Sequence, residues 1–152
     1  MMTRATRRPA HGQRGSTTVE FAIVGTLALL FMLSIVDFGR ALYTYHLVSN
    51  AARLATRYAI VHGSSCSSAN CPVSESGLQT YVRGMSPGVD ITQLNLTATW
   101  SPNPADGCSV APYQGSGCLV TVKVAYLFSF ISPMLPGVSM PMNSVSQMFI
   151  SQ

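Results

Sequence analysis

The chain has 152 residues, which is enough for one domain and a membrane segment but too short for two full catalytic domains. Only 9% of the residues are charged and 47% are hydrophobic, a bias typical of a membrane-embedded chain. Four arginines before residue 15 supply the net charge of +4, because basic and acidic residues balance from residue 16 onward. Such a neutral body lacks the basic face that nucleic-acid binding requires, so no nucleic-acid partner is expected.

A basic leader of residues 1–15 precedes a long apolar segment. Residues 21–36 carry no formal charge, and from Val19 the chain reads VEFAIVGTLALLFMLSIV with Glu20 as its one charge. A bilayer core requires about 17 to 25 helical residues, so we expect a single span over about residues 17–43. The arginines on one side predict a cytoplasmic N-terminus and a C-terminal domain outside the membrane. A cleaved signal peptide fits less well, because no A-x-A pattern or helix breaker follows.

The helical pattern continues far beyond the length of a membrane. Apolar and small residues recur at helical intervals as far as His62, and no proline occurs between Pro9 and Pro72. The sequence therefore predicts one helix over residues 16–62, capped near Gly63. Its second half carries a stripe of small residues that permits close approach of another helix or a sheet: Ala51, Ala52, Ala55 and Ala59.

All four cysteines follow the apolar segment, which favours disulfides in an oxidising compartment. The nearest-neighbour pairing joins Cys66 to Cys71 and Cys108 to Cys118, although four cysteines allow three connectivities. A zinc site is the competing interpretation. The C-x4-C and C-x9-C spacings do not both match the usual zinc-binding pairs, so no metal is expected.

Residues 63–152 are predicted to form a small extracytoplasmic β domain. A short helix is expected over residues 75–83, and two strands over residues 91–100 and 119–128, where apolar and polar residues alternate. A final strand over residues 138–150 contains Pro141, which suggests a sheet edge or an interruption. The apolar segment FSFISPML is expected to form a buried turn rather than a second membrane contact, because it is short and carries a proline with another close behind. The predicted fold class is therefore α+β, with a long N-terminal transmembrane helix extending into a small antiparallel sheet.

No constellation of catalytic residues is visible in the sequence. His46 and His62 have no acid nearby in the chain, so packing or surface roles are expected for both. Asp37 and Arg40 are three residues apart and can form a helical ion pair. The sequence predicts neither an enzyme nor a cofactor.

The segment Arg14-Gly15-Ser16-Thr17-Thr18-Val19-Glu20-Phe21 resembles the cleavage site of type IV prepilins and pseudopilins. The resemblance implies that a prepilin peptidase cuts between Gly15 and Ser16, leaving Glu20 as the fifth residue. An acid within hydrocarbon is costly and usually pairs. The resemblance implies that its partner is the terminal amine of a neighbouring subunit, although Glu20 could instead snorkel to the interface.

Over residues 14–62 the chain more closely resembles the TadE-like family of minor pilins or pseudopilins from tight-adherence (Tad or Flp-type) pilus systems. The matching blocks are Val19-Glu20-Phe21, Asp37-Phe38-Gly39-Arg40, Asn50-Ala51-Ala52-Arg53 and Arg57-Tyr58-Ala59. The resemblance implies a pilin-like fold in the bacterial inner membrane and possible incorporation into the pilus. Its implied partners are the prepilin peptidase, other pilin-like subunits, Tad inner-membrane components and the lipid bilayer.

Two functions of different classes follow from these patterns. The first is an assembly role in a Tad-type pilus, exerted through helix packing around Glu20 and Phe21. The alternative is an extracytoplasmic binding or adhesion module whose uncleaved helix is only an anchor. Cleavage after Gly15 and the effect of substituting Glu20 distinguish the two.

Overall fold

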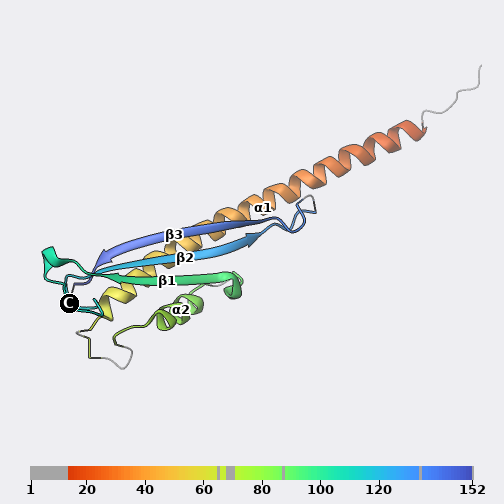
Figure 1. Ribbon diagram of the computed structural model, residues 1–152. Helices are drawn as coiled ribbons and strands as arrows, with labels where there is room; N and C mark the ends of the chain where they lie inside the picture. The colour runs from red at the N-terminus through yellow and green to blue at the C-terminus, as the bar shows by residue number, and fades with distance from the viewer. Residues whose placement is uncertain (1–13, 65, 68–70, 87, 134, 152) are drawn as a thin grey trace, which may run out of the picture.

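A 48-residue helix, α1 (Arg14–Val61), dominates the fold. The structure is a computed structural model and describes residues 14–64, 66–67, 71–86, 88–133 and 135–151. At 1.5 Å per residue α1 is about 70 Å long, and Figure 1 shows its N-terminal half projecting beyond the rest of the molecule. The predicted long helix is confirmed. Most of the predicted basic leader lies outside the described residues.

The second half of the chain forms a three-stranded antiparallel sheet in the order β1-β2-β3. Its strands are β1 (Leu94–Ser101), β2 (Leu119–Ser129) and β3 (Ser139–Phe149). Opposite pairs include Leu96 with Val124 and Val122 with Ser146. The predicted α+β class is confirmed, and β3 with its Pro141 lies at an edge of the sheet.

The predicted first strand begins three residues too early. A 3₁₀ turn occupies Ile91–Gln93, and Asp90 caps it by accepting hydrogen bonds from the Thr92 hydroxyl at 2.7 Å and the Thr92 amide at 3.0 Å. These two hydrogen bonds hold the pKa of the Asp90 carboxyl below its usual value. The local capping bonds thus delay the start of the strand.

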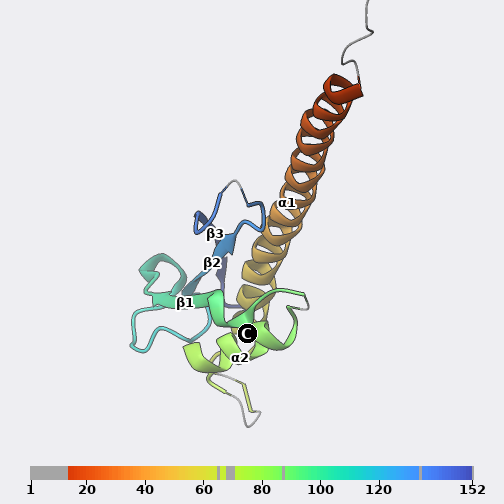
Figure 2. The ribbon, with the colours of Figure 1, turned by 90° about the vertical axis from the view of Figure 1, so that its right-hand side faces the viewer.

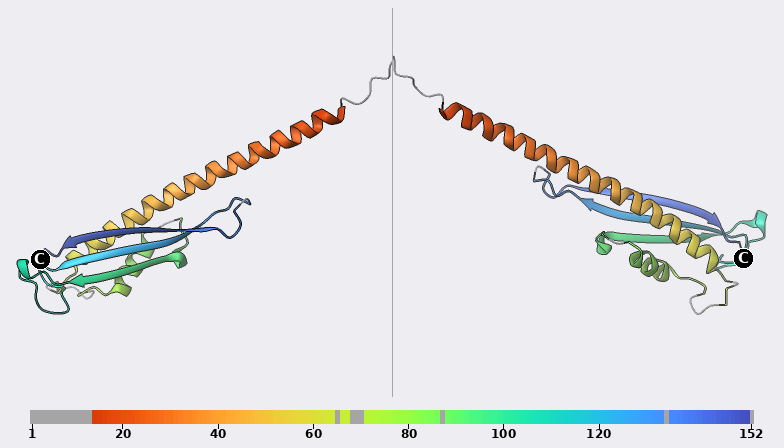
Figure 3. Two further views of the ribbon diagram at one scale, coloured as in Figure 1. Left: turned by 45° about the horizontal axis from the view of Figure 1, so that its top comes forward. Right: turned by 180° about the vertical axis from the view of Figure 1, so that it is seen from behind.

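Both helices cover the same face of the sheet. The long helix packs across β2 and β3, while α2 (Glu75–Gly84) packs beside it against β1 (Figures 2 and 3). Ser74 caps the N-terminus of α2, because its hydroxyl accepts a hydrogen bond from the Gly77 amide. Alternation along the strands directs their apolar side chains toward the helices, as predicted: Leu94, Leu96, Ala98, Val120, Val122 and Val124 are all buried.

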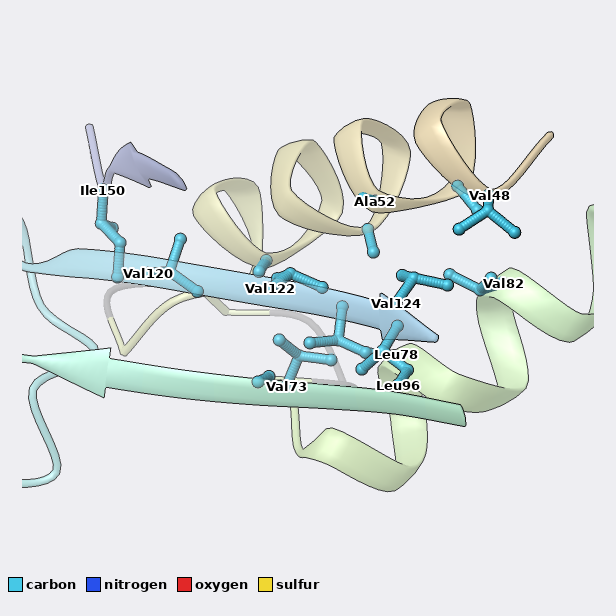
Figure 4. Close-up of a cluster of buried hydrophobic side chains, with 14 of the residues drawn as sticks. Val48, Ala52, Val73, Leu78, Val82, Leu96, Val120, Val122, Val124 and Ile150 are labelled. Carbon is cyan, nitrogen blue, oxygen red and sulfur yellow. The ribbon is translucent and has the colours of Figure 1, made fainter. Parts of the chain in front are cut away.

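The small-residue stripe of α1 lies directly on this apolar face. Ala52, Ala55 and Ala59 are completely buried, and Figure 4 shows Val48 and Ala52 directed at the valines of β2 and the apolar residues of α2. Small side chains allow the helix backbone to approach the sheet closely. The Thr56 hydroxyl accordingly lies 3.4 Å from the Ser146 carbonyl oxygen on β3. The predicted role of the stripe is confirmed, with the sheet as its partner.

Two disulfides close the loops at the end of the domain farthest from the N-terminus. They join Cys66 to Cys71 and Cys108 to Cys118, the nearest-neighbour pairing. Because all four sulfurs are consumed in disulfides, the competing zinc interpretation does not apply. The second bridge lies beside Gly117, where a φ of 79° and the Asp106 carbonyl oxygen against the site of a Cβ leave space only for glycine.

The connection between β2 and β3 forms the turn predicted for FSFISPML, but the turn is not buried. Ile131 is 64% exposed, and Leu135 and Val138 are also exposed. The hairpin runs back along α1 toward the projecting half of the helix (Figure 1), so its tip extends beyond the core of the domain. The prediction of a buried turn therefore holds for Phe128 and Ser132 but is wrong for the apolar side chains at the tip. The tip has α1 on one side, and its exposed apolar side chains are not covered by any other described part of the chain.

Substitution Ala52→Leu tests the close helix–sheet packing. Leucine keeps the helix propensity high, but its side chain has no space against β2, so the domain is expected to lose about 1 to 3 kcal/mol of stability. Denaturant unfolding of the detergent-solubilised full chain, followed by the fluorescence of Trp100, measures the loss. Ala105→Leu, in an exposed loop, is the matched control and should change stability by less than about 0.5 kcal/mol. Equal effects of the two variants would contradict the packing argument.

Candidate functional site

The first half of α1 is an uncovered apolar rod. Residues 15–36 are exposed apart from the half-buried Leu30 and Leu33, and Phe21 is 78% exposed. Among the described residues α1 is the one helix long and apolar enough to cross a membrane. A soluble protein does not leave such a large apolar surface in water, so lipid or other protein must cover it. This half of α1 is therefore a candidate membrane anchor for the C-terminal domain.

The predicted cleavage and assembly residues lie on this rod, away from the sheet. Gly15 and Ser16 occupy the first turn of α1, and Glu20 and Phe21 follow one turn later. All four are exposed, and the fold does not bring them together with the C-terminal domain. The structure therefore leaves them accessible to groups supplied by another molecule.

Asp37 lies where the uncovered part of the helix ends, and it holds the hairpin tip. Its carboxylate oxygens accept hydrogen bonds from the backbone N–H groups of Ile131 at 3.1 Å and Ser132 at 2.8 Å. The residue is only 4% exposed although it interrupts an apolar helix. Hydrogen bonds from amides to a charged acceptor are among the stronger ones in proteins. They fix the tip of the β2–β3 hairpin beside this turn of α1.

Arg40 completes the contact between the helix and the hairpin. Its guanidinium lies 3.2 Å from an oxygen of Asp37, which confirms the predicted ion pair. The same guanidinium lies over the Phe128 ring, 5.3 Å from the centroid, and Phe130 packs edge-on against that ring. The cation thus bridges a carboxylate of the helix and an aromatic residue of β2. We call Asp37, Arg40, Phe128, Ile131 and Ser132 the seam.

An open groove of about 980 Å³ lies beside the seam, between α1 and the hairpin. Ser34, Phe38 and Leu42 form its helix side, and Leu135 and Met140 are among the hairpin residues opposite. The groove is bordered mostly by apolar side chains. It continues the apolar surface of the uncovered helix into the domain.

The histidines and acidic residues of the described chain are dispersed. Within the described residues no group of three histidine, cysteine or acidic side chains could hold a metal ion. His62 stacks on Tyr58 with ring centroids 3.9 Å apart, and Tyr58 stacks in turn on Tyr81 of α2. His62 thus has the packing role that was predicted for it. The apolar groove and the uncovered helix surface are suited to contacts with lipid or protein.

The ion pair of Asp37 and Arg40 is predictable from the sequence, but the contact of Asp37 with the β2–β3 hairpin is not. The partners of Asp37 are backbone amides more than ninety residues farther along the chain, and a backbone amide has no side-chain identity that a pattern could reveal. The sequence does carry one relevant signal. It has no charged residue from Val124 onward, so any partner of Asp37 in that segment must be an uncharged group.

Substitution Asp37→Asn tests the seam. The carboxamide nitrogen cannot accept a backbone N–H, so at least one of the two amide bonds is lost and the tip loosens. Hydrogen exchange of the Ile131 and Ser132 amides in the detergent-solubilised chain should accelerate by roughly tenfold or more. Asp90→Asn is the matched control, because Asp90 binds Thr92 elsewhere in the domain, and it should leave these two amides unchanged. Unaltered exchange in Asp37→Asn would show that the carboxylate does not hold the tip.

The similarity to known proteins lies in α1. Residues 15–57 match the family model described as TadE-like protein, which covers the uncovered rod, the helix residues of the seam and most of the small-residue stripe. No curated protein and no solved structure matches the chain. The match includes Gly15, Ser16, Glu20 and Phe21 but ends before the sheet begins. The predicted resemblance is thereby confirmed over residues 15–57, where the long helix is similar to the TadE-like family.

Proposed function

We propose that this chain is a minor pilin-like subunit of the bacterial inner membrane that is needed to assemble a Tad or Flp-type pilus. The observation that carries the proposal is the uncovered rod, residues 15–36, lying within the TadE-like match and bearing Glu20 near its start. A helix exposed on nearly all sides requires a surrounding medium. Lipid supplies that medium in the membrane, and the helices of sister subunits supply it in an assembled fibre.

Glu20 gives this packing a defined register. A carboxylate in hydrocarbon is costly when unpaired, so a partner cation gains both attraction and relief from that cost. We propose that the partner is the amine of Ser16 in a neighbouring subunit, created by removal of residues 1–15. Phe21 lies next to this charge on the exposed helix surface and supplies apolar contact beside it. Paired in this way, the two subunits would dock with a fixed axial offset.

The position of Gly15 is compatible with cleavage by a prepilin peptidase. It lies in the first turn of α1, where helix ends fray, and a Cβ placed there would meet nothing within 4 Å. Glycine also weakens the helix locally. A peptidase can therefore unwind this turn and reach the Gly15–Ser16 bond without disturbing the seam or the sheet.

The proposed topology follows from the same elements. The arginines of the leader remain in the cytoplasm and the disulfide-bonded domain lies in the periplasm. Of the span predicted over about residues 17–43, we assign residues 17–36 to the membrane, because the hairpin contacts the helix from Asp37 onward. The role is structural rather than enzymatic, since it uses helix packing and a charge pair. The proposed partners are the prepilin peptidase, other pilin-like subunits and Tad inner-membrane components.

Substitution Glu20→Ala tests the proposal in cells that make the pilus. The variant should insert and accumulate normally, because alanine favours both helix and membrane, yet surface pili counted by electron microscopy should be lost or strongly reduced. Glu75→Ala, which removes an exposed carboxylate on α2, is the matched control and should leave piliation unchanged.

A helix exchange separates this proposal from the anchored-module alternative. Replacing residues 17–36 by an unrelated apolar helix preserves an anchor but removes Glu20 and the shape of the rod. Loss of pili in this chimera and in Glu20→Ala supports the assembly role. Normal piliation in both variants would overturn it and leave the C-terminal domain as the functional part.

A further inference from the structure

We propose that the tip of the β2–β3 hairpin inserts into the outer-leaflet interface of the bilayer, so that the domain rests on the membrane as well as being anchored through it. The tip is defined here by the exposed apolar residues Ile131, Leu135, Val138 and Met140. This inference rests on the proposal that residues 17–36 cross the membrane.

The tip lies beside the turn of α1 at which the proposed membrane span ends. Residues 17–36 measure about 30 Å as a helix, which equals the thickness of the hydrocarbon core. Asp37 is the next residue, and it accepts hydrogen bonds from the backbone N–H groups of Ile131 and Ser132. The tip is therefore held at the level where the helix leaves the hydrocarbon. Leu135 borders the same groove as Ser34, which lies nearly one turn deeper in the helix.

The tip is apolar and carries no charged side chain. Its four defining side chains are apolar and exposed, with Ile131 the most exposed of them, and the sequence carries no charge after Lys123. Arg40, the cation of the seam, is paired with Asp37, and its side chain is 41% exposed, which lets the guanidinium reach the head groups. Insertion of the tip would therefore carry no unpaired charge into hydrocarbon.

Several backbone amides of the tip are hydrogen-bonded within the chain. This matters because unpaired amides exclude most loops from lipid. The amides of Ile131 and Ser132 donate to Asp37, that of Leu135 donates to the Ser132 carbonyl, and that of Val138 donates to the Leu135 carbonyl. Pro133 and Pro136 have no N–H to satisfy. These four hydrogen bonds and the two prolines lower the cost of placing this part of the backbone in the membrane interface.

The lipid surface fits this tip better than a second protein copy does. The hairpin tip lies beside the middle of α1, next to the projecting half of the helix (Figures 1 and 3). A bilayer that surrounds residues 17–36 would therefore meet the tip. A protein partner would have to displace that lipid. Lipid tails also fill an open apolar groove of irregular shape without requiring complementary side chains.

Depth-dependent quenching tests the insertion. The full chain, whose four native cysteines are paired, receives one new cysteine for an environment-sensitive fluorophore: Leu135→Cys or Val138→Cys at the tip, Val24→Cys in the span, or Val110→Cys at the far end of the domain. Each protein is reconstituted in phosphatidylethanolamine–phosphatidylglycerol vesicles with spin-labelled lipids, and iodide serves as the aqueous quencher. Intact disulfides and native Trp100 emission verify the fold of each variant.

The expected result is several-fold stronger quenching by shallow spin labels at both tip positions than in the Val110→Cys variant, with iodide quenching reversed. A tip open to iodide while the fluorophore of the Val24→Cys variant is quenched by lipid would overturn the insertion and leave the membrane span standing. A tip shielded from both quenchers would also overturn it, in favour of a second copy as the cover. Absence of lipid quenching in the Val24→Cys variant would remove the membrane span and the insertion with it.

Discussion

One helix has to satisfy two different surroundings, and the rest of the structure follows from that constraint. The half of α1 after Asp37 meets its own sheet through alanines, whereas the half before it presents large apolar side chains to the outside. Burial of apolar surface drives both contacts. The helix is continuous from Arg14 to Val61, so the uncovered half is connected to the domain without a break.

The seam is the junction between these two halves. The Asp37 carboxylate would be costly at the end of an apolar helix, but two backbone amides and Arg40 satisfy it, and they attach the distal hairpin to the same helical turn. A single residue therefore fixes how far the sheet extends toward the anchor. The proposed membrane contact of the tip depends on this position.

The elements could be predicted well from the sequence because their signals are local. Charge asymmetry and an unbroken apolar run indicated the long helix, and alternation of apolar and polar residues indicated β1 and β2.

The sequence does not decide among the three possible pairings of the cysteines, since loop geometry decides the pairing. The residues of the 3₁₀ turn, Ile91–Gln93, continue the alternation of apolar and polar residues that predicts a strand. The hydrogen bonds from Thr92 to Asp90 form a turn there instead. The exposed tip was read as buried because apolarity indicates removal from water without identifying the medium. The contact between Asp37 and the hairpin amides was invisible, because no sequence pattern reveals which distant backbone groups a carboxylate will meet.

Processing at Gly15 is the most direct test of the central claim that the uncovered rod is a pilin-type assembly helix. The measurement is the N-terminal sequence and intact mass of the protein from membranes of cells with and without the prepilin peptidase. The account predicts a chain that begins at Ser16 only when the peptidase is present, with Glu20 then four residues from a free amine. A chain that retains residues 1–15 in both strains would contradict it and would reduce the helix to a simple anchor.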